Sequence, residues 1–286
     1  MKAYRSWNIH SIRIVALALL SLAAVPATMA QTYTITTLAI FNGTNGAFPQ
    51  GDLTLRGNTL YGITSDGGVN KKGTVFSVPT TGGTPTILAS FNGTDGKYPT
   101  AGLILCGSIL YGTTEYGGAN NFGTVFSVPT TGGIPTVVAS FNGMNGEAPT
   151  ASLTLSGSTL YGTTIRGGVH NHGTVFSVPI TGGSPTVIAS FNGKNGSQPY
   201  ANLTLSGSTL YGTTMLGGAN SRADNWGTVF SVATTGGTGT ADLTYFENFL
   251  DFTAETPEPG TFSLMGFALC GFWLLFRFTK PTSSKG

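Results

Sequence analysis

Few residues in this chain carry the side chains that catalysis requires, and their spacing does not assemble a catalytic set. The three histidines are His10, His170 and His172, and the last two lie two positions apart in one loop. A serine hydrolase needs a nucleophile, a general base and an acid that orients the base. Serine and threonine recur throughout the chain, but no base recurs with them. We therefore expect no catalytic residue and a protein that is not an enzyme.

The acidic residues also give no indication of a catalytic site. Glycosidases hold two carboxylates close together across the scissile bond. Pairing of this kind is conceivable in the folded chain, but no sequence pattern predicts it. The acidic residues concerned fall in different sections of the chain: Asp66, Asp95, Glu115 and Glu147.

Two motifs could bind a metal ion, and both have a simpler interpretation. His170 and His172 could be ligands, but two histidines in a polar loop are more often solvated side chains. The loop FNGTNG, from Phe41 to Gly46, and its three later copies could offer oxygen ligands to calcium. Calcium sites use several carboxylates, and only Asp95 supplies one. We interpret these loops as turns in which asparagine and glycine adopt positive φ, and expect neither a metal nor a cofactor.

Composition excludes two classes of protein. The chain has 286 residues, of which 43 are glycine and only 8% are charged. Disordered chains are usually rich in charge and poor in aromatic residues, so this composition indicates many short strands joined by tight turns. The two ends carry the net charge of +2, because residues 31–256 contain seven basic and ten acidic side chains. A nucleic-acid-binding protein concentrates basic charge in its folded domain, so nucleic acid is excluded as a partner.

The N-terminus, residues 1–30, has the three parts of a secretory signal peptide. Lys2, Arg5 and Arg13 form a basic region, an apolar run follows, and small residues precede a cleavage site after Ala30. The alternative is an uncleaved membrane anchor, but the apolar run is short and the small residues follow at once. We expect export and removal of this segment by signal peptidase.

The C-terminus combines a linker at residues 251–260, an apolar segment at 261–278 and a basic tail at 279–286. A helix needs about 17–20 apolar residues to cross the hydrocarbon core of a membrane, and the apolar segment reaches that length. Arg277 and Lys280 would hold the tail in the cytoplasm and leave the repeats outside. The alternative is a buried core strand or helix, but no other part of the chain matches this segment. We expect one C-terminal transmembrane helix.

The order of these parts resembles the PEP-CTERM sorting signal of Gram-negative bacteria. The residues that carry the resemblance are the triplet Pro257, Glu258 and Pro259, the apolar segment and Arg277. The resemblance implies processing near the triplet by an exosortase, which is a membrane cysteine protease and transpeptidase. It also implies a transient inner-membrane anchor, followed by transfer to the cell surface or the extracellular matrix.

Between these ends, residues 31–250 consist of tandem repeats with a period of 50 residues. Periods of about 20–50 residues indicate a repeat architecture. Three motifs recur at this spacing, with four additional residues before the last copy of the third: FNG from Phe41, Phe91, Phe141 and Phe191; LYG from Leu60, Leu110, Leu160 and Leu210; GTVFSV from Gly73, Gly123, Gly173 and Gly227.

Each repeat contains four segments with the composition of β-strands. In the third repeat these are residues 152–157, 159–164, 173–178 and 185–191. Four short antiparallel strands per repeat of about 40–50 residues are typical of a β-propeller blade. We therefore expect an all-β, propeller-like domain of about four four-stranded blades; the alternatives are an open stack of small sheets and a β-solenoid. Either residues 32–41 or residues 241–246 could supply the strand that completes the last blade.

The pattern LYGTTxxGGxxxxGTVFSV is similar to the repeat of a bacterial exported family named GloVer. The resemblance covers all four repeats, roughly residues 32–246. It implies export and a repeat fold, and members of the family carry various C-terminal anchors, PEP-CTERM signals among them. It implies no particular chemistry.

One face of each strand should supply the cores between neighbouring blades, because a single repeat cannot bury its own apolar side chains. The expected core residues of the third repeat are Leu153, Leu155, Leu160, Val175, Phe176, Val187 and Phe191.

The loops indicate where a partner would bind. Because the strands alternate in direction, the loop after the second strand and the connection to the next repeat lie on one face of the domain. These segments vary between the repeats, whereas the turns on the opposite face are nearly constant. Loops on a rigid frame are the usual place for recognition, although neutral variation would give the same pattern. The candidate binding residues are Tyr116, Arg166, His170, His172 and Trp226.

These features predict a non-enzymatic exported surface or matrix protein whose repeats interact with exopolysaccharide or other envelope components. Two alternatives stay open: a lectin-like propeller with defined sugar sites, and a polysaccharide-active enzyme. The same polar or aromatic residue at equivalent loop positions would favour the lectin. The positions after the second strand differ, although three of them carry rings: Lys72, Phe122, His172 and Trp226.

Overall fold

The computed structural model describes residues 34–218 and 226–235. Strands, turns and loops account for all of these residues, so the all-β prediction is confirmed for this part of the chain. Among the same residues no helix is long and apolar enough to cross a membrane. The expected signal peptide, the triplet 257–259, the apolar segment 261–278 and the tail with Arg277 and Lys280 lie outside the described residues.

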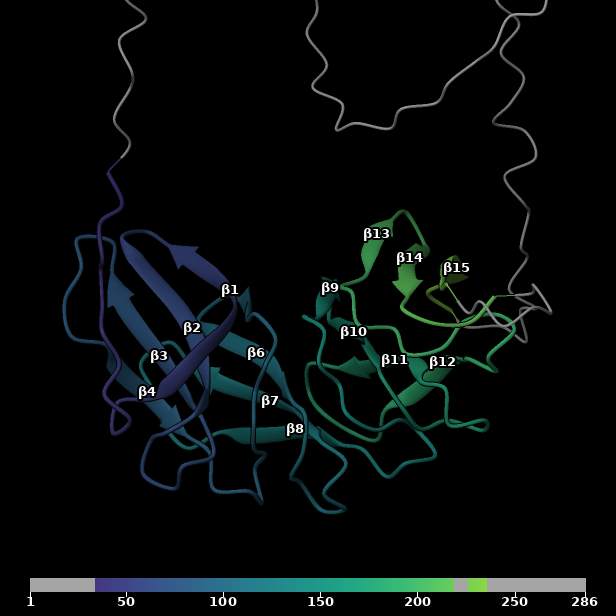
Figure 1. Ribbon diagram of the computed structural model, residues 1–286, viewed down its shortest axis with the longest axis horizontal. Coiled ribbons are helices and arrows are strands. Elements are labelled where there is room, and N and C mark those ends of the chain that lie inside the picture. Colours follow the sequence, from purple (N-terminus) through teal and green to yellow (C-terminus); the bar gives the residue numbers. More distant parts are fainter. Residues whose placement is uncertain (1–33, 219–225, 236–286) are drawn as a thin grey trace, which may run out of the picture. The chain divides into compact units, whose positions relative to one another are not determined.

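Each repeat folds into its own small antiparallel sheet, in which the strands are hydrogen-bonded in chain order (Figure 1). Sheets 1 to 3 have the expected four strands, and three strands of sheet 4 are described. Sheet 1 contains β1 (Ala47–Arg56), β2 (Thr59–Asp66), β3 (Thr74–Pro79) and β4 (Thr86–Ser90); sheet 2 contains β5 (Ile104–Cys106), β6 (Ile109–Thr114), β7 (Thr124–Pro129) and β8 (Thr136–Ser140); sheet 3 contains β9 (Thr154–Ser156), β10 (Thr159–Thr164), β11 (Thr174–Pro179) and β12 (Thr186–Ser190); sheet 4 contains β13 (Thr204–Ser206), β14 (Thr209–Thr214) and β15 (Thr228–Ala233).

The turns follow from the residues that the repeats place between strands. In sheet 3 the pair Ser156–Thr159 closes a two-residue turn in which Gly157 has a φ of 57°. Glycine adopts this left-handed conformation without the steric cost that a side chain would add. The strands themselves are rich in threonine, valine and aromatic residues, which fit a pleated, half-buried surface.

A β-bulge corrects one part of the expected core. Simple alternation along β12 predicted Val187 in the core, but its side chain is 37% exposed, whereas Ile188 is only 6% exposed. Strand β12 pairs Ala189 with Val175 and Val187 with Phe176, so Ile188 is an extra residue between the two pairs. A bulge of this kind shifts the inward-facing positions by one residue, and the same shift occurs in sheets 1 and 2.

The cores lie between consecutive sheets, as the repeat pattern predicts. Leu155 contributes only a partly buried side chain at the edge of the core, and the other expected residues except Val187 are buried. Between sheets 2 and 3, the second sheet and the residue that follows it supply Tyr111, Val125, Val138, Ala139 and Phe141, and the third sheet and the residue that precedes it supply Leu153, Leu160, Phe176 and Val178.

A threonine pair ties the second strand of each sheet to the third. In sheet 3 the hydroxyl oxygens of Thr164 and Thr174 are 2.8 Å apart and both side chains are buried. The hydroxyl of Thr164 also donates to the carbonyl of Arg166 and accepts from the amide of Thr174. This network fixes the chain at the end of β10, where Arg166 leaves the sheet. The same hydroxyl contact of 2.8 Å recurs in the other three sheets.

The sheets follow one another without closing into a ring in the described part of the chain. Hydrogen bonds and ring contacts join each sheet to the next, and none joins sheet 1 to sheet 4. The successive small antiparallel sheets make the fold propeller-like, but no closed ring is formed by the described residues. Of the two candidates for a closing strand, residues 34–41 form no strand and lie against sheet 1, and residues 241–246 lie outside the described residues.

Candidate functional site

The variable connections come together on one side of the sheets. The segment that leads out of each sheet forms an isolated bridge with the residue just beyond the second strand of the next sheet. These bridges join Lys97 to Tyr116, Glu147 to Arg166, and Ser197 to Leu216. Two of the expected binding residues, Tyr116 and Arg166, therefore occupy equivalent positions in neighbouring repeats.

The backbone of these connections has an unusual conformation. Tyr98, Ala148 and Gln198 have φ values of 56–57°, although none of them is glycine, and Phe48 at the equivalent position in β1 has a φ of 54°. Such residues cost conformational energy and are concentrated at binding sites and switch regions. Gln198 is held in place because its amide donates to the carbonyl of His172 and its carbonyl accepts from the amide of Met215.

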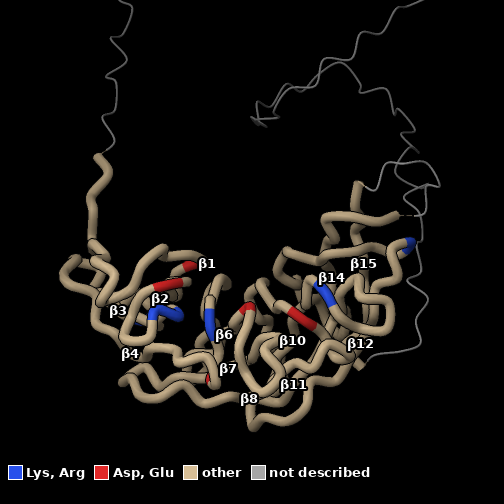
Figure 2. Tube along the Cα trace, turned by 60° about the horizontal axis from the view of Figure 1, so that its bottom comes forward, with Lys and Arg blue, Asp and Glu red and all other residues tan. Residues whose placement is uncertain are grey.

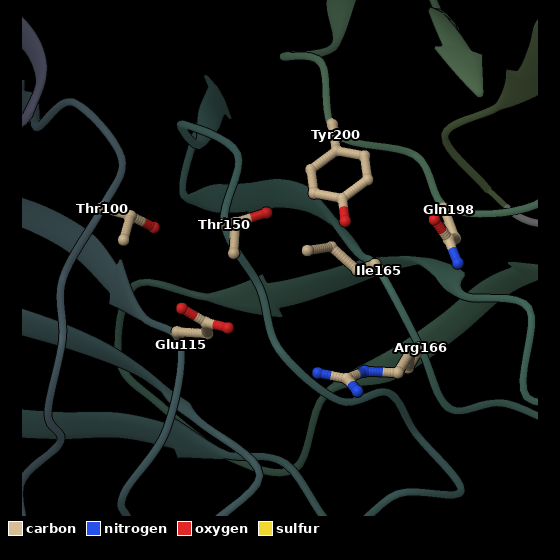
Figure 3. Close-up of a pocket in the computed structure, with 7 residues that line it drawn as sticks. All are labelled: Thr100, Glu115, Thr150, Ile165, Arg166, Gln198 and Tyr200. Atoms are coloured by element: carbon tan, nitrogen blue, oxygen red, sulfur yellow. The ribbon is translucent and has the colours of Figure 1, made fainter. Parts of the chain in front are cut away.

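A pocket of about 420 Å³ opens between the connections of sheets 2, 3 and 4 (Figure 3). This volume lies within the range of small-molecule sites. Figure 3 shows the carboxylate of Glu115 and the guanidinium of Arg166 pointing into the space between them, with the hydroxyl of Tyr200 directed toward the same space. Three consecutive repeats supply the lining: Thr100, Glu115, Thr150, Ile165, Arg166, Gln198 and Tyr200.

Arg166 is positioned by two contacts outside the pocket. Its Nε atom lies 3.6 Å from Oε1 of Glu147, and its Nη2 donates to the hydroxyl of Tyr116 at 3.5 Å. The side chain is 43% exposed, so the ion pair contributes little to stability and acts mainly by orienting the guanidinium. A guanidinium has five N–H donors, so donors stay available on the pocket side. Acidic and basic residues are interspersed near β6, β10 and β14 (Figure 2).

Tyr116 supports this arrangement without lining the pocket. Its ring meets that of Tyr98 edge to face, with centroids 6.3 Å apart, and Nζ of Lys97 lies 5.8 Å from its centroid. The carboxylate of Glu115, together with partial burial, raises the pKa of the Tyr116 phenol, and Arg166 opposes this effect by lowering it. The phenol is therefore protonated at neutral pH and can donate a hydrogen bond as well as accept one from Arg166.

Two buried hydroxyls in the pocket lining have no hydrogen-bond partner among the described residues. They belong to Thr100 and Thr150, which occupy equivalent positions in successive repeats. Buried hydroxyls are usually hydrogen-bonded, and each can donate one bond and accept two. The pocket therefore presents hydroxyl groups, a carboxylate, an amide and a guanidinium to whatever enters it.

The other expected binding residues lie outside the pocket. The side chain of Trp226 is 84% exposed, and His170 is exposed in its loop. The ring of His172 is half-buried, and its Nδ1 makes a hydrogen bond of 2.9 Å with the hydroxyl of Ser197. Its equivalent Lys72 donates from Nζ to the carbonyl of Asn92, so this position holds the neighbouring loop in place.

Sequence reasoning missed five residues of the pocket. Thr100, Thr150 and Tyr200 are spaced 50 residues apart, directly after a proline, and could have been found by comparing that position between repeats. Ile165 and Gln198 carried no comparable signal, because only the folded chain brings them together.

The described residues give no metal site. They contain no group of three or more histidine, cysteine, aspartate or glutamate side chains that could hold an ion. In the FNG loops the side chains of Asn42 and Asn45 each accept a hydrogen bond from the other's backbone amide. Gly43 and Gly46 have positive φ, but the asparagines do not. The interpretation as turns is thus confirmed for the glycines and wrong for the asparagines.

This chain is thus an all-β tandem-repeat protein with propeller-like sheets and a polar pocket in the connections between them. The chain belongs to the Gloeobacter/Verrucomicrobia repeat family, whose sequence profile matches residues 26–230. This match confirms the resemblance of the repeats to the GloVer pattern. The PEP-CTERM signal lies beyond the matched residues and stays a prediction.

No curated protein matches this chain. Among solved structures 44 chains match, and they include TolB from Agrobacterium tumefaciens, with 16% sequence identity and a TM-score of 0.40. The matched region covers 63% of this chain and 59% of the TolB chain.

Proposed function

We propose that this protein is an exported surface or matrix protein whose repeat domain binds polysaccharide, with the sugar contacted in the pocket between sheets 2, 3 and 4. The observation that supports the proposal is the combination of groups in that pocket. Thr100, Thr150, Gln198 and Tyr200 can each donate and accept hydrogen bonds, and Glu115 and Arg166 extend the set.

Sugars match this chemistry because every hydroxyl of a sugar is both a donor and an acceptor. The two threonine hydroxyls without partners among the described residues can bond to sugar hydroxyls from either direction. Tyr200 is 48% exposed, so its ring offers a flat apolar area with a polar edge to a sugar ring. A pocket with this defined set of polar groups favours the lectin-like form of this function over unspecific adhesion.

The proposed location rests on the two ends of the chain. A cleaved signal peptide at residues 1–30 would export the protein, and the triplet Pro257, Glu258 and Pro259 would make it a substrate for an exosortase-like enzyme. The segment 261–278 would then anchor it in the inner membrane only until it is sorted. The match to the repeat family supports the tandem-repeat domain and leaves both the location and the ligand open.

The proposal is tested by glycan-array binding of the full chain, followed by titration of the sugars that bind. The Tyr200→Ala variant removes an aromatic contact and a hydrogen bond, which together are worth about 1.5–2 kcal/mol, so its affinity should fall by about tenfold or more. The matched control is Trp226→Ala, which removes a more exposed aromatic side chain outside the pocket and should leave affinity unchanged. Equal affinity of both variants would move the site away from the pocket, and an array without any bound sugar would reject the proposal.

A further inference from the structure

The first described segment of the chain lies where a strand of a preceding sheet would lie. The amide of Gly83 in sheet 1 donates to the carbonyl of Leu38 at 2.9 Å. The equivalent amides of Gly133 and Gly183 donate to Leu88 and Val138, which belong to the fourth strand of the sheet before. Residues 34–41 therefore contact sheet 1 in the way that β4 contacts sheet 2, yet they belong to no sheet of their own.

The aromatic contacts repeat the same relationship. Phe41 packs edge to face on Phe76, with ring centroids 4.9 Å apart and an interplanar angle of 69°. Three equivalent pairs have centroid distances of 4.8–5.0 Å and angles of 71–73°, and each joins the residue after a fourth strand to the third strand of the next sheet.

The opposite end of the array has the complementary gap. In sheets 1 to 3 the third strand pairs with a fourth strand on its outer side. Among the described residues β15, the third strand of sheet 4, pairs with β14 alone. The described chain thus holds a strand-like segment without a sheet at one end and a sheet without its fourth strand at the other.

The side chains at the two ends are exposed where their equivalents are buried. At the sheet 4 end, Val229 is 65% exposed and Tyr211 is 44% exposed, whereas Val175 is fully buried and Tyr161 is 8% exposed. At the sheet 1 end, Leu53 is 56% exposed, although its equivalents in the other three sheets are 6–7% exposed.

An apolar groove at the sheet 1 end has the composition of half an internal core. It has a volume of about 350 Å³, and Leu38, Ala39 and Phe41 form one wall. Leu53, Leu60, Phe76 and Val78 form the other wall. In the core between sheets 1 and 2 the equivalents of all seven residues are present, and Tyr61, Ile63 and Val75 of the earlier sheet fill the space between them. The residues equivalent to Tyr61 and Val75 in sheet 4 are Tyr211 and Val229.

We propose that sheet 4 of one copy of this chain packs against sheet 1 of a second copy, with residues 34–41 of the second copy completing the first copy's last sheet. The ladder of sheet 3 predicts the register: Thr228 opposite Ile40, Val229 opposite Ala39, Phe230 opposite Thr37 and Ser231 opposite Thr36. Tyr211 and Val229 enter the groove beside Leu53. The contact repeats an interface that the chain already builds three times within itself.

A second copy would fill the groove at sheet 1 and complete sheet 4 without any change in the packing of the four sheets. Among residues 34–218 and 226–235 no hydrogen bond or ring contact joins sheet 1 to sheet 4, so the described part of sheet 4 does not occupy the groove at sheet 1. The two surfaces are different, and a head-to-tail contact between different surfaces extends into a filament or closes into a ring of copies. Such an assembly would present several sugar pockets along one surface and raise avidity for a polymer.

Disulfide trapping on the full chain tests the predicted register. In a background with Cys106→Ser and Cys270→Ser, one tagged chain carries Ala39→Cys and a differently tagged chain carries Val229→Cys. Opposite residues of antiparallel strands have Cα atoms about 4.5–5.5 Å apart, which permits a disulfide. We expect a covalent dimer that carries both tags, and a ladder of multimers from a chain that carries both cysteines.

Two controls distinguish the contact between two copies from random cross-linking and from closure of one chain on itself. Ile134→Cys, at an 83% exposed position, replaces Ala39→Cys and should give no disulfide with Val229→Cys. If the chain with both cysteines forms only an internal disulfide, it closes on itself and the proposal is wrong. Absence of any disulfide between positions 39 and 229 also overturns it.

A second measurement is independent of cysteine chemistry. The mass of the wild-type protein in sedimentation should rise with concentration, and Val229→Asp should abolish that rise because a carboxylate would enter the apolar groove. Val69→Asp, at an 85% exposed position in a loop, should assemble like the wild type. A wild-type mass that stays at one chain at all concentrations would contradict the proposal without affecting sugar binding by the pocket.

Discussion

Phe141 and Phe176 meet edge to face across the boundary between two sheets, with ring centroids 4.9 Å apart and an interplanar angle of 73°. Phe141 follows the last strand of sheet 2, and Phe176 lies in the third strand of sheet 3. Both side chains are fully buried. Because equivalent pairs recur along the chain, this contact is the unit that joins one repeat to the next.

Removal of one ring should therefore destabilise the whole array. We expect Phe141→Ala to lower the free energy of unfolding by about 3–5 kcal/mol, because it leaves a cavity and exposes the edge of Phe176. Urea unfolding followed by circular dichroism measures the change. Ile134→Ala, at an exposed turn position, is the control and should change the free energy by less than about 0.5 kcal/mol. Similar losses from both variants would contradict the assignment of the cohesive contact to the rings.

A side chain at position 162 should strain the core as long as the ring of Phe176 is present. A Cβ atom at this position would lie 2.6 Å from Cζ of Phe176 and 3.1 Å from Cδ2 of Leu153. We expect Gly162→Ala to destabilise the protein by about 1–3 kcal/mol through overpacking. In a double-mutant cycle, Phe176→Leu should absorb part of this cost, since it removes the ring atoms that clash. Additive effects of the two substitutions would show that the strain arises elsewhere.

The Tyr116 phenol should respond to its two charged neighbours in opposite directions. Its pKa is raised mainly by Glu115 and lowered by Arg166. Glu115→Gln should therefore lower this pKa toward its ordinary value of about 10, and Arg166→Met should raise it further. Titration of the tyrosine Cζ resonance by NMR measures both shifts.

The raised pKa of Tyr116 determines how the contribution of this side chain to the stability of the fold depends on pH. A phenol whose pKa is higher in the folded protein stabilises the fold below the unfolded pKa, and this contribution is lost as the pH rises through the folded pKa. Wild-type stability should thus gain a small component below about pH 10 that Glu115→Gln lacks. Shifts of the Tyr116 pKa in the same direction in both variants would contradict the arrangement of the three side chains.

The exported protein should lack both ends of the chain. The signal peptide at residues 1–30 and the segment after the triplet Pro257, Glu258 and Pro259 should be absent from its intact mass. A chain with Glu258→Ala and Pro259→Ala should keep its C-terminal segment and stay in the membrane fraction. A mature wild-type mass that includes residues 262–286 would identify the segment as a permanent anchor.

The repeat, the strands within it and most of the core could be predicted from the amino-acid sequence. A period of 50 residues with alternating apolar side chains is a local signal, and it located Leu153, Leu160 and Phe176 correctly in the core, although the equivalent Leu53 at the open end of sheet 1 is 56% exposed. The prediction from alternating side chains was wrong at Val187. A bulge arises from the pairing of two strands, so the sequence of one strand does not reveal it. The variable loops were also identified correctly as one side of the sheets, and they contain Tyr116 and Arg166.

Which loop residues share a site could not be predicted in this way, because it depends on how the sheets pack. Thr100, Thr150, Gln198 and Tyr200 come from three successive repeats, and their convergence depends on how each sheet packs against the next. Trp226 and His170 had equally suggestive side chains, but their positions in the loops keep them outside the pocket. The open ends of the array also depend on tertiary packing. A repeat sequence specifies the interface between neighbouring sheets, but the packing of all the sheets determines whether the first sheet meets the last.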